Sequence, residues 1–382
     1  MKAYCLNNIS KVALDGLKAP DTTVATIEEC DSILVRSANM LDTELPKNVL
    51  AVARAGAGVN NIPLTAYADN GIVVFNTPGA NANAVKELVI CSLFLAARDI
   101  IGGSEWVKAN ASDEAIAKTA EKAKAKFAGT EIAGKTLAVI GLGVIGVKVA
   151  DAAVKLGMDV YGYDPYLSIG NAMQLDKKVK YCENLTDAVK NADYITIHVP
   201  AMESTKKMIN AGVINSAVKD VIVLNFSRDS LVNEEDMKAA LESGKVKKYI
   251  TDFANPNVVT FPNTVVLPHL GASTEEAEDN CAIMAINELK DYIENGNITH
   301  SVNYPDLNAG AKGAEKRITV CHKNIPGIIA NFSSQIFKTG ANIINLANKS
   351  KGDYAYSVIG VDGEVDAEVI RKMDGVLSVR VL

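Results

Sequence analysis

Three features are scarce in this sequence of 382 residues: cysteine, net charge and long apolar runs. The six cysteines are scattered and form no C-x-x-C pair, so we expect reduced thiols in a cytoplasmic protein, not a disulfide framework or a zinc site. The net charge of −6 argues against a nucleic-acid partner. No apolar run reaches the roughly 18 residues of a transmembrane helix, and the first ten residues lack the apolar core of a signal peptide. We therefore expect no membrane partner.

Apolar residues are abundant, and one stretch of them carries a clear motif. The hydrophobic content of 48% is ample for large cores, and the length predicts two or three domains. Thr136–Ile140 is short and apolar, which is typical of a buried parallel strand. Gly141, Gly143 and Gly146 follow it as G-x-G-x-x-G, and a helical pattern and a second strand lead to Asp164. This context predicts a dinucleotide site.

Each part of this motif has a physical reason. The first glycine allows a tight turn, the second lets the backbone approach a pyrophosphate, and the third lets helix and strand pack closely. The helix N-terminus attracts the phosphate charge. Asp164 would accept hydrogen bonds from the ribose hydroxyls and repel a 2′-phosphate, so NAD is favoured over NADP. The alternative is a glycine-rich turn with no ligand.

Four further strands are predicted after Asp164, and each ends in a polar or charged residue. The strands are Tyr194–Val199, Val221–Phe226, Lys248–Asp252 and Thr264–Leu267, and the residues at their ends are His198, Arg228, Asp252 and His269. Ligands bind outside the carboxyl ends of strands in open α/β sheets, so this convergence predicts the rim of an active site. His198 precedes Val-Pro and is equally explained as a packed or capping histidine.

Strand-like runs at Ala3–Leu6, Ser32–Arg36, Leu50–Ala53 and Ile72–Phe75 predict a separate parallel α/β domain ahead of the nucleotide motif. Two loops follow its last strands, at residues 54–61 and 76–83. Their glycines would let backbone N–H groups reach a carboxylate. Ordinary turn chemistry is the alternative for either loop.

Long helices are predicted at Asn83–Ile101, Ala109–Ala128 and Ser273–Asn295, the last leading the chain back to the first domain. Residues 303–316 contain Pro and Gly without periodicity and are read as a linker. The tail follows the order βαββαβ, a ferredoxin-like split unit. The predicted domain bounds are 1–98 with 283–303 for substrate, 99–282 for NAD, 304–316 for the linker and 317–382 for the tail.

At this point a family resemblance is evident. The motifs on which it rests are RAGAGVNN, NTPGANANA, GLGVIG, HVP, NFSR, TDF and PHLGAST, and then HKNIPGI and GANI in the tail. The chain resembles the D-isomer-specific 2-hydroxyacid dehydrogenases along nearly its whole length. The tail narrows the resemblance to the branch that acts on D-3-phosphoglycerate and ends in an ACT regulatory domain.

The resemblance implies an α/β fold with a Rossmann-type NAD-binding domain, a flavodoxin-like substrate domain and a ferredoxin-like ACT domain. It implies NAD-dependent oxidation of D-3-phosphoglycerate to 3-phosphohydroxypyruvate, the first step of serine biosynthesis, by a cytoplasmic homodimer or homotetramer. Arg228 would hold the substrate carboxylate and the C2 oxygen. His269 would take the hydroxyl proton.

The resemblance also implies the binding residues. The cofactor would contact Ala57, Gly141, Gly143, Val144, Ile145, Gly146, Asp164, Val199, Phe226, Ser227, Asp252, Gly271 and Ala272. The substrate and its phosphate would contact Arg36, Arg54, Ala57, Gly58, Asn81 and Lys108, with Trp106 and Lys108 coming from a neighbouring subunit. L-serine would bind His322, Asn324 and Asn342 across a dimer interface and cause feedback inhibition. The alternative for these three is a set of turn and cap residues.

One departure from the family pattern concerns the histidine. Relatives place a Glu in a D-V-F-x-x-E-P segment, and that Glu orients the histidine. Here no acid occurs between Asp252 and His269, and Asn255 or Asn257 is the candidate replacement. An amide can fix the imidazole tautomer but supplies no charge. Asp229-Ser230 also stands where relatives often have Gly-Gly.

Two other functions remain open. One is a different 2-hydroxyacid dehydrogenase, reducing glyoxylate, hydroxypyruvate or 2-oxoglutarate. The other is a NAD-sensing binding protein without useful turnover, which the missing Glu favours and the retained Arg228 and His269 oppose.

Overall fold

The computed structural model describes all residues from Met1 to Leu382, and they divide into two compact units. Unit 1 comprises Met1–Asn81 and Glu275–Leu382, and unit 2 comprises Ala82–Thr274. The tail is part of unit 1. The sequence placed the domain boundaries instead at 98/99 and 282/283, and those functional bounds stay a prediction.

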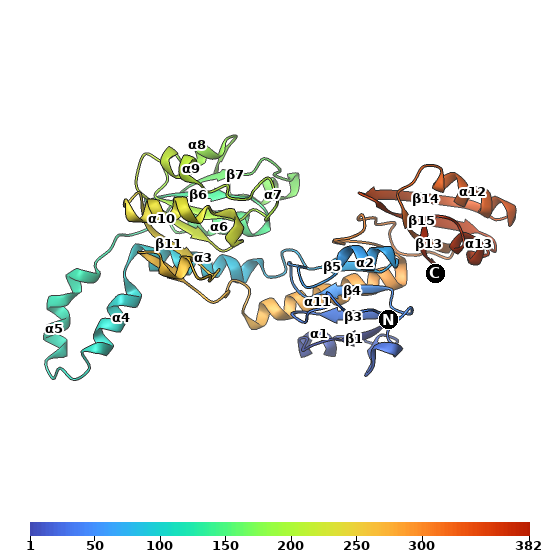
Figure 1. Ribbon diagram of the computed structural model, residues 1–382, viewed down its shortest axis with the longest axis horizontal. Coiled ribbons are helices and arrows are strands. Elements are labelled where there is room, and N and C mark those ends of the chain that lie inside the picture. The colour runs from blue at the N-terminus through green and yellow to red at the C-terminus, as the bar shows by residue number, and fades with distance from the viewer. The chain divides into compact units, whose positions relative to one another are not determined.

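Unit 2 is built on a seven-stranded parallel sheet in the order β12-β11-β10-β9-β6-β7-β8 (Figure 1). Its strands are β6 (Thr136–Ile140), β7 (Asp159–Tyr163), β8 (Lys180–Cys182), β9 (Tyr194–Ile197), β10 (Val221–Asn225), β11 (Val246–Thr251) and β12 (Thr264–Val266). The strand order reverses between β6 and β9, as in a doubly wound Rossmann fold. The sequence missed only the short, polar β8.

Helices cover both faces of this sheet, which is why its central strands read as continuous apolar runs. One face is covered by α8 (Leu185–Val189), α9 (Ala211–Ser216) and α10 (Glu234–Glu242). The other is covered by α3 (Ala82–Ala97) and α6 (Val144–Lys155). The remaining helical elements are α4 (Ile100–Ala109), α5 (Ile116–Ala123), α7 (Ile169–Gln174) and the 3-10 turns η2 (Lys124–Phe127), η3 (Asp229–Leu231) and η4 (Val258–Thr260).

The prediction of one helix over Asn83–Ile101 was wrong, because the chain forms α3 and α4 with a break at residues 98–99. The carbonyl oxygen of Ala97 accepts from the backbone N–H of Thr130 at 2.9 Å. The side chain of Asp99 then caps α4 by accepting from the N–H of Gly102 at 3.1 Å. The single helix predicted over Ala109–Ala128 is likewise shorter, with only α5 and η2 forming.

Unit 1 contains a five-stranded parallel sheet in the order β2-β1-β3-β4-β5. Its strands are β1 (Lys2–Cys5), β2 (Thr22–Thr23), β3 (Ser32–Val35), β4 (Ala51–Arg54) and β5 (Val73–Asn76). The short helices α1 (Lys11–Asp15) and α2 (Leu64–Asp69), the turn η1 (Ile27–Glu29) and the long helix α11 (Glu275–Asn295) complete it. As predicted, α11 returns to this sheet, where its buried Ala285, Leu289 and Tyr292 pack beside Phe75.

The tail forms a four-stranded antiparallel sheet in the order β14-β15-β13-β16. Its elements are β13 (Lys316–Lys323), α12 (Ile328–Lys338), β14 (Asn342–Lys351), β15 (Tyr354–Asp362), α13 (Ala367–Arg371) and β16 (Val376–Val381). This confirms the βαββαβ order and, with the two parallel sheets, the predicted α/β fold class.

Both faces of the tail sheet are covered. The two tail helices pack on one face through Phe332, Ile336 and Ile370. On the other face, Cys321 and Tyr356 join a cluster with Tyr292 and Tyr304. The hydroxyl of Tyr356 donates to the carbonyl oxygen of Gly296 at 2.7 Å. The tail therefore packs directly against the C-terminal end of α11.

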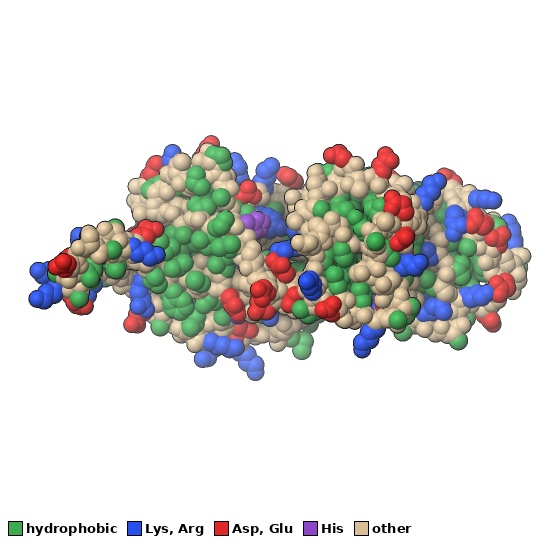
Figure 2. Space-filling view, turned by 90° about the horizontal axis from the view of Figure 1, so that it is seen from below, with side chains coloured by type: hydrophobic (Ala, Val, Ile, Leu, Met, Phe, Trp, Pro, Cys, Tyr) green, Lys and Arg blue, Asp and Glu red, His purple; other side chains and the backbone are tan.

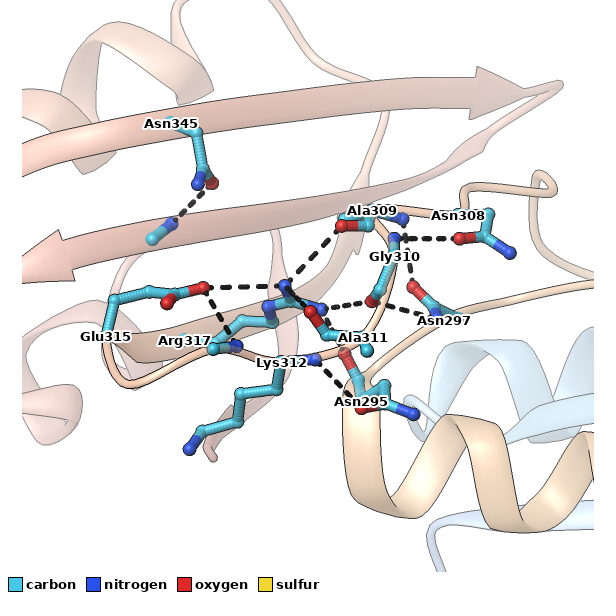
Figure 3. Close-up of polar contacts among 12 residues, drawn as sticks. Asn295, Asn297, Asn308, Ala309, Gly310, Ala311, Lys312, Glu315, Arg317 and Asn345 are labelled. Atoms are coloured by element: carbon cyan, nitrogen blue, oxygen red, sulfur yellow. Dashed lines mark hydrogen bonds and ion pairs between the residues drawn. The ribbon is translucent and has the colours of Figure 1, made fainter.

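The linker is held in place by one buried cation (Figure 3). Arg317 is 3% exposed, and its guanidinium donates to the carbonyl oxygens of Asn295 at 2.8 Å and Gly310 at 2.9 Å. It also lies 3.6 Å from the carboxylate of Glu315. Asn297 donates to the carbonyl of Gly310 at 3.2 Å. Residues 304–316 are thus fixed by the residues on either side of them.

The distribution of charged side chains on the surface is consistent with the small net charge. On the face shown in Figure 2, acidic and basic side chains are interspersed. All six cysteines are free thiols. None of the helices has the length and apolar character needed to span a bilayer.

The role of Arg317 can be tested by Arg317→Met. We expect the tail to lose about 1.5–3 kcal/mol of local stability, because the carbonyl oxygens of Asn295 and Gly310 lose a charged donor. Hydrogen exchange of the β13 and β15 amides measures this directly. The adjacent Lys316 forms only an exposed pair with Glu364, so Lys316→Met should change the same amides by less than about 1 kcal/mol. Equal effects of the two substitutions would contradict this role for Arg317.

Candidate active site

The glycine motif forms the turn between β6 and α6, as the sequence predicted. Gly141 has a φ of +96°, and a side chain there would overlap the backbone of His198. A side chain at Gly146 would overlap the carbonyl of Gly141. At Gly143, in contrast, a Cβ would meet no protein atom within 4 Å. Packing inside the protein explains the first and third glycines, and open space for an approaching group explains the second.

The groups beside this turn fit a dinucleotide. Helix α6 begins at Val144, which is 47% exposed, and the N–H groups of the first turn have no partners within the helix. The carboxylate of Asp164, at the end of the neighbouring β7, accepts from the N–H groups of Leu142 and Tyr166, both at 2.8 Å. These bonds fix the acid beside the glycine turn, with lone pairs left for ribose hydroxyls. The residues present therefore suit NAD.

A second group of predicted residues follows three neighbouring strands. Arg228 comes after β10, Asp252 after β11 and His269 after β12, and these strands are adjacent in the sheet. Arg228 and His269 are exposed, while Asp252 is only 1% exposed. The Oδ2 atom of Asp252 accepts from the N–H of Gly271 at 2.8 Å, and its Oδ1 atom is buried without a partner. An unpaired buried oxygen at this edge suits a donor from a bound ligand.

The charges of these residues act on one another. Burial raises the pKa of Asp252 above its ordinary range, while the Gly271 N–H group, the imidazole of His269 and the guanidinium of Arg228 oppose the shift. Burial is the larger effect. Arg228, Asp252 and His269 thus follow neighbouring strands at one edge of the sheet, with the carboxylate in the middle of the three.

His269 has an unusual backbone. Its φ is +51°, in the left-handed region that a non-glycine residue rarely adopts. Its N–H donates to the carbonyl oxygens of Asp252 at 2.9 Å and Leu267 at 3.1 Å, which holds this conformation. The imidazole ring lies 5.0 Å from the ring of Phe253 at an interplanar angle of 62°.

Neither Asn255 nor Asn257 forms the expected direct hydrogen bond with the histidine, because the side-chain amides of both residues donate instead to Glu234, at the start of α10. Sequence reasoning missed Glu234 and Phe253. Glu234 looked like an ordinary acid in the first turn of a helix, and the only sign for Phe253 was its place directly after Asp252.

His198 is explained by packing. Its ring lies 2.9 Å from the hydroxyl of Thr196, and burial lowers the pKa of His198 to about 3, so the ring is neutral. Val199 and Phe226 are buried, which leaves mainly their backbone atoms for a ligand. The Ser227 hydroxyl donates to the carbonyl of Val199 at 2.5 Å and joins the two strand ends. Ala272 is half-buried beside Gly271.

The predicted substrate residues of unit 1 cluster around the loop after β4. The guanidinium of Arg54 lies against Gly56, and its Nε donates to the carbonyl of Arg36 at 3.1 Å. Arg36 forms an ion pair with Glu278. Asn76 donates to the carbonyl of Ala57 at 2.6 Å, next to Gly58. Asn81 ends this part of unit 1, whereas Lys108 is exposed on α4 in unit 2.

The three predicted serine residues are not together within one chain. His322 is 1% exposed, and its ring packs 5.3 Å from that of Phe332 and bonds Ser357 at 2.9 Å. Asn324 is exposed and donates to the carbonyl of Gly352 at 3.1 Å. In the strand register, Ala355 pairs with His322, whereas Asp362 pairs with Asn342. Asn342 therefore lies at the opposite end of the sheet from the other two.

Comparisons with known proteins identify the family. Residues 90–271 match the model of the D-isomer specific 2-hydroxyacid dehydrogenase, NAD binding domain. D-3-phosphoglycerate dehydrogenase of Haemophilus influenzae is 30% identical over 97% of this chain and 90% of its own length. The enzyme of that name from Methanocaldococcus jannaschii is 31% identical over 79% of this chain, but the chain spans only 57% of its length.

Solved structures show the same fold. A D-2-hydroxyisocaproate dehydrogenase has a TM-score of 0.64 and 23% identity, covering 79% of this chain and 100% of its own. A 3-phosphoglycerate dehydrogenase of Entamoeba histolytica, solved with NAD⁺, has a TM-score of 0.62 and 24% identity, covering 80% and 99%. The chain belongs to the D-isomer specific 2-hydroxyacid dehydrogenases. It is an oxidoreductase that uses NAD and acts on a small molecule.

The burial of the Asp252 carboxylate predicts how the stability of the protein depends on pH. Because its pKa is raised in the folded protein, ionising it opposes folding as the pH rises through the raised value. Asp252→Asn should therefore raise the melting temperature of the NAD-free protein at pH 7. The gap between variant and parent should narrow as the pH falls below that raised value, because the parent side chain then also becomes neutral. Thermal unfolding from pH 4 to 8 measures the gap, and a gap that does not depend on pH would contradict this account.

Proposed function

We propose that this protein oxidises D-3-phosphoglycerate to 3-phosphohydroxypyruvate with NAD, the first step of serine biosynthesis. One observation carries the chemistry: Arg228, the buried Asp252 and His269 follow three adjacent strands, at the edge of the sheet that also bears the glycine turn. A guanidinium and an imidazole at that edge suit a 2-hydroxy acid, which presents a carboxylate and a hydroxyl on neighbouring carbons.

Each side chain has a distinct task in this proposal. The planar fork of Arg228 binds the substrate carboxylate and the C2 oxygen. His269 accepts the hydroxyl proton at an imidazole nitrogen. When bound, NAD⁺ accepts the hydride that leaves C2, so that the alcohol becomes a ketone. The unpartnered oxygen of Asp252 would accept from the nicotinamide end, and the α6 N-terminus with Asp164 would hold the other end.

The choice of substrate rests on two supports. The curated relatives named above are D-3-phosphoglycerate dehydrogenases, and the first of them aligns over nearly all of both chains. Arg54 lies against the loop at residues 55–58, where a cation with backbone N–H groups suits an anionic substrate. Arg36 is a weaker candidate for the phosphate, because Glu278 already neutralises it.

That ion pair is the reason to keep a second candidate. If Arg36 and Lys108 bind no phosphate, the site suits a smaller acid such as glyoxylate or hydroxypyruvate. Initial rates of oxidation or reduction with each acid, at equal concentration, decide between them. D-3-phosphoglycerate should give the highest kcat/KM. No turnover with any acid would favour a NAD-sensing protein.

Arg228 provides the test of the reaction. Arg228→Ala should lower kcat/KM for the 2-hydroxy acid by about 10³-fold, because both the charge and the bidentate contact are lost. Arg228→Lys keeps the charge but not the planar fork, so it should recover only part of the rate. NADH formation at 340 nm is the measurement. The side chain is exposed and bonds only the carbonyl of Ser227, so Arg228→Lys, which keeps the positive charge near Asp252, should not change the melting temperature.

Regulation by L-serine at His322, Asn324 and Asn342 is part of the proposal. The strand register separates Asn342 from the other two within one chain, so only a second copy could complete such a site. A homodimer or homotetramer is therefore proposed, and sedimentation velocity tests it. The six free thiols support placing the protein in the cytoplasm.

Serine regulation can be tested with a matched pair on β14. Serine should inhibit NADH formation, and its binding should give a measurable heat in a calorimetric titration. Asn342→Ala should weaken that inhibition by at least tenfold, because the amide offers both a donor and an acceptor to an amino acid. Lys349→Ala, on the same exposed strand, should behave as the parent does. If the parent protein shows no heat of binding and no inhibition, L-serine is removed from the proposal.

A further inference from the structure

The sequence has no acid between Asp252 and His269, yet the carboxylate of Glu234 reaches this segment from another element. Glu234 accepts from the side-chain amide of Asn255 at 2.7 Å through Oε1, and from that of Asn257 at 3.0 Å through Oε2. Both carboxylate oxygens are thus engaged by the loop between β11 and β12. We refer to Glu234, Asn255 and Asn257 as the carboxylate–amide clamp.

Asn255 uses both ends of its amide. Its oxygen accepts from the backbone N–H groups of Asn257 and Val258, both at 2.9 Å, and so shapes the turn that begins η4. Its nitrogen is the donor to Glu234. The two roles are chemically distinct, so the orientation of the amide is fixed. An aspartate at this position would keep the acceptor role and lose only the donor.

The clamped loop leads directly to the histidine. Phe253 lies two residues before Asn255, and its N–H donates to the hydroxyl of Thr251 at 3.2 Å. Its ring is the 5.0 Å neighbour of the His269 imidazole. No side chain forms a hydrogen bond with either ring nitrogen of His269. The aromatic contact is therefore what the structure offers to orient this ring on its left-handed backbone.

We propose that Glu234, acting through Asn255, is a positioning residue that holds Phe253 and thereby the imidazole of His269. This inference rests on the proposed function, in which His269 is the base. Phe253 packs on the ring, and the clamp fixes the backbone that carries Phe253. The aromatic ring of Phe253 thus supplies orientation to the imidazole but no charge, and the carboxylate of Glu234 is engaged by the two amides.

A pair of exchanges tests the clamp. Asn255→Asp turns the donor toward Glu234 into a second carboxylate, and Glu234→Gln removes the charge that the amides bind. Each should lower kcat about tenfold to a hundredfold, because a displaced base loses alignment. Each should leave the KM for NAD within about twofold, because the glycine turn is untouched. The double variant restores complementarity, since the new amide can donate to the new carboxylate and accept from Asn257. It should regain most of the parental kcat.

The kinetic isotope effect separates positioning from general damage. With D-3-phosphoglycerate deuterated at C2, the isotope effect on kcat should rise in each single variant, because the chemical step becomes slower than product release. It should return toward the parental value in the double variant. Asn308→Asp is the matched control, because the oxygen of exposed Asn308 also accepts from an N–H two residues later, at 2.8 Å, far along the chain from this loop. This control should match the parent in kcat, isotope effect and melting temperature.

The outcomes distinguish this inference from the proposed function. If His269→Gln retains the parental rate, His269 is not the base, and both proposals fail. If His269→Gln is inactive while both single clamp variants keep the parental kcat and isotope effect, only the clamp is overturned. Failure of the double variant to recover also overturns it. Should the single variants fold poorly, Phe253→Leu tests the contact between the Phe253 ring and the His269 imidazole. A parental kcat in that variant contradicts the proposal.

Discussion

The burial of one carboxylate is the constraint on which the candidate site depends. Asp252 is almost fully covered, keeps one oxygen unpaired and uses the other to fix Gly271 in the loop that carries His269. The arrangement costs stability, because burial disfavours the charged form of Asp252 more than its neighbours favour it. Such a cost is typical of functional positions, where groups are ordered for a ligand and not for the empty protein.

The rest of unit 2 supports that carboxylate. Three neighbouring parallel strands end at the same edge, so Arg228, Asp252 and His269 need no long-range folding of loops to come near one another. The glycine turn opens at the reversal of the strand order, where doubly wound sheets bind dinucleotides. One apolar core on each face of the sheet fixes the strand positions.

Much of this could be predicted from local patterns, and the misses share a cause. Gly141, Gly143, Asp164 and the strand ends were predictable because short apolar runs, glycine spacing and turn residues are encoded locally. The break between α3 and α4 was not, because the carbonyl of Ala97 is taken by Thr130, which is distant in sequence. The partner of Asn255 was missed for the same reason, since Glu234 lies 21 residues earlier on another element. Motifs show which residues are present, but not which distant side chain engages them.

The packing of the tail on α11 has a mechanical consequence. α11 contains 21 residues and would extend for about 30 Å at the usual rise of an α-helix. It starts six residues after His269, and near its other end the ring of Tyr292 lies 4.6 Å from the guanidinium of Arg380, on the last tail strand. Residues packed on one end of a continuous helix constrain the direction of its axis along the whole length. The tail therefore helps to set the axis of the helix that begins six residues after His269 in the sequence.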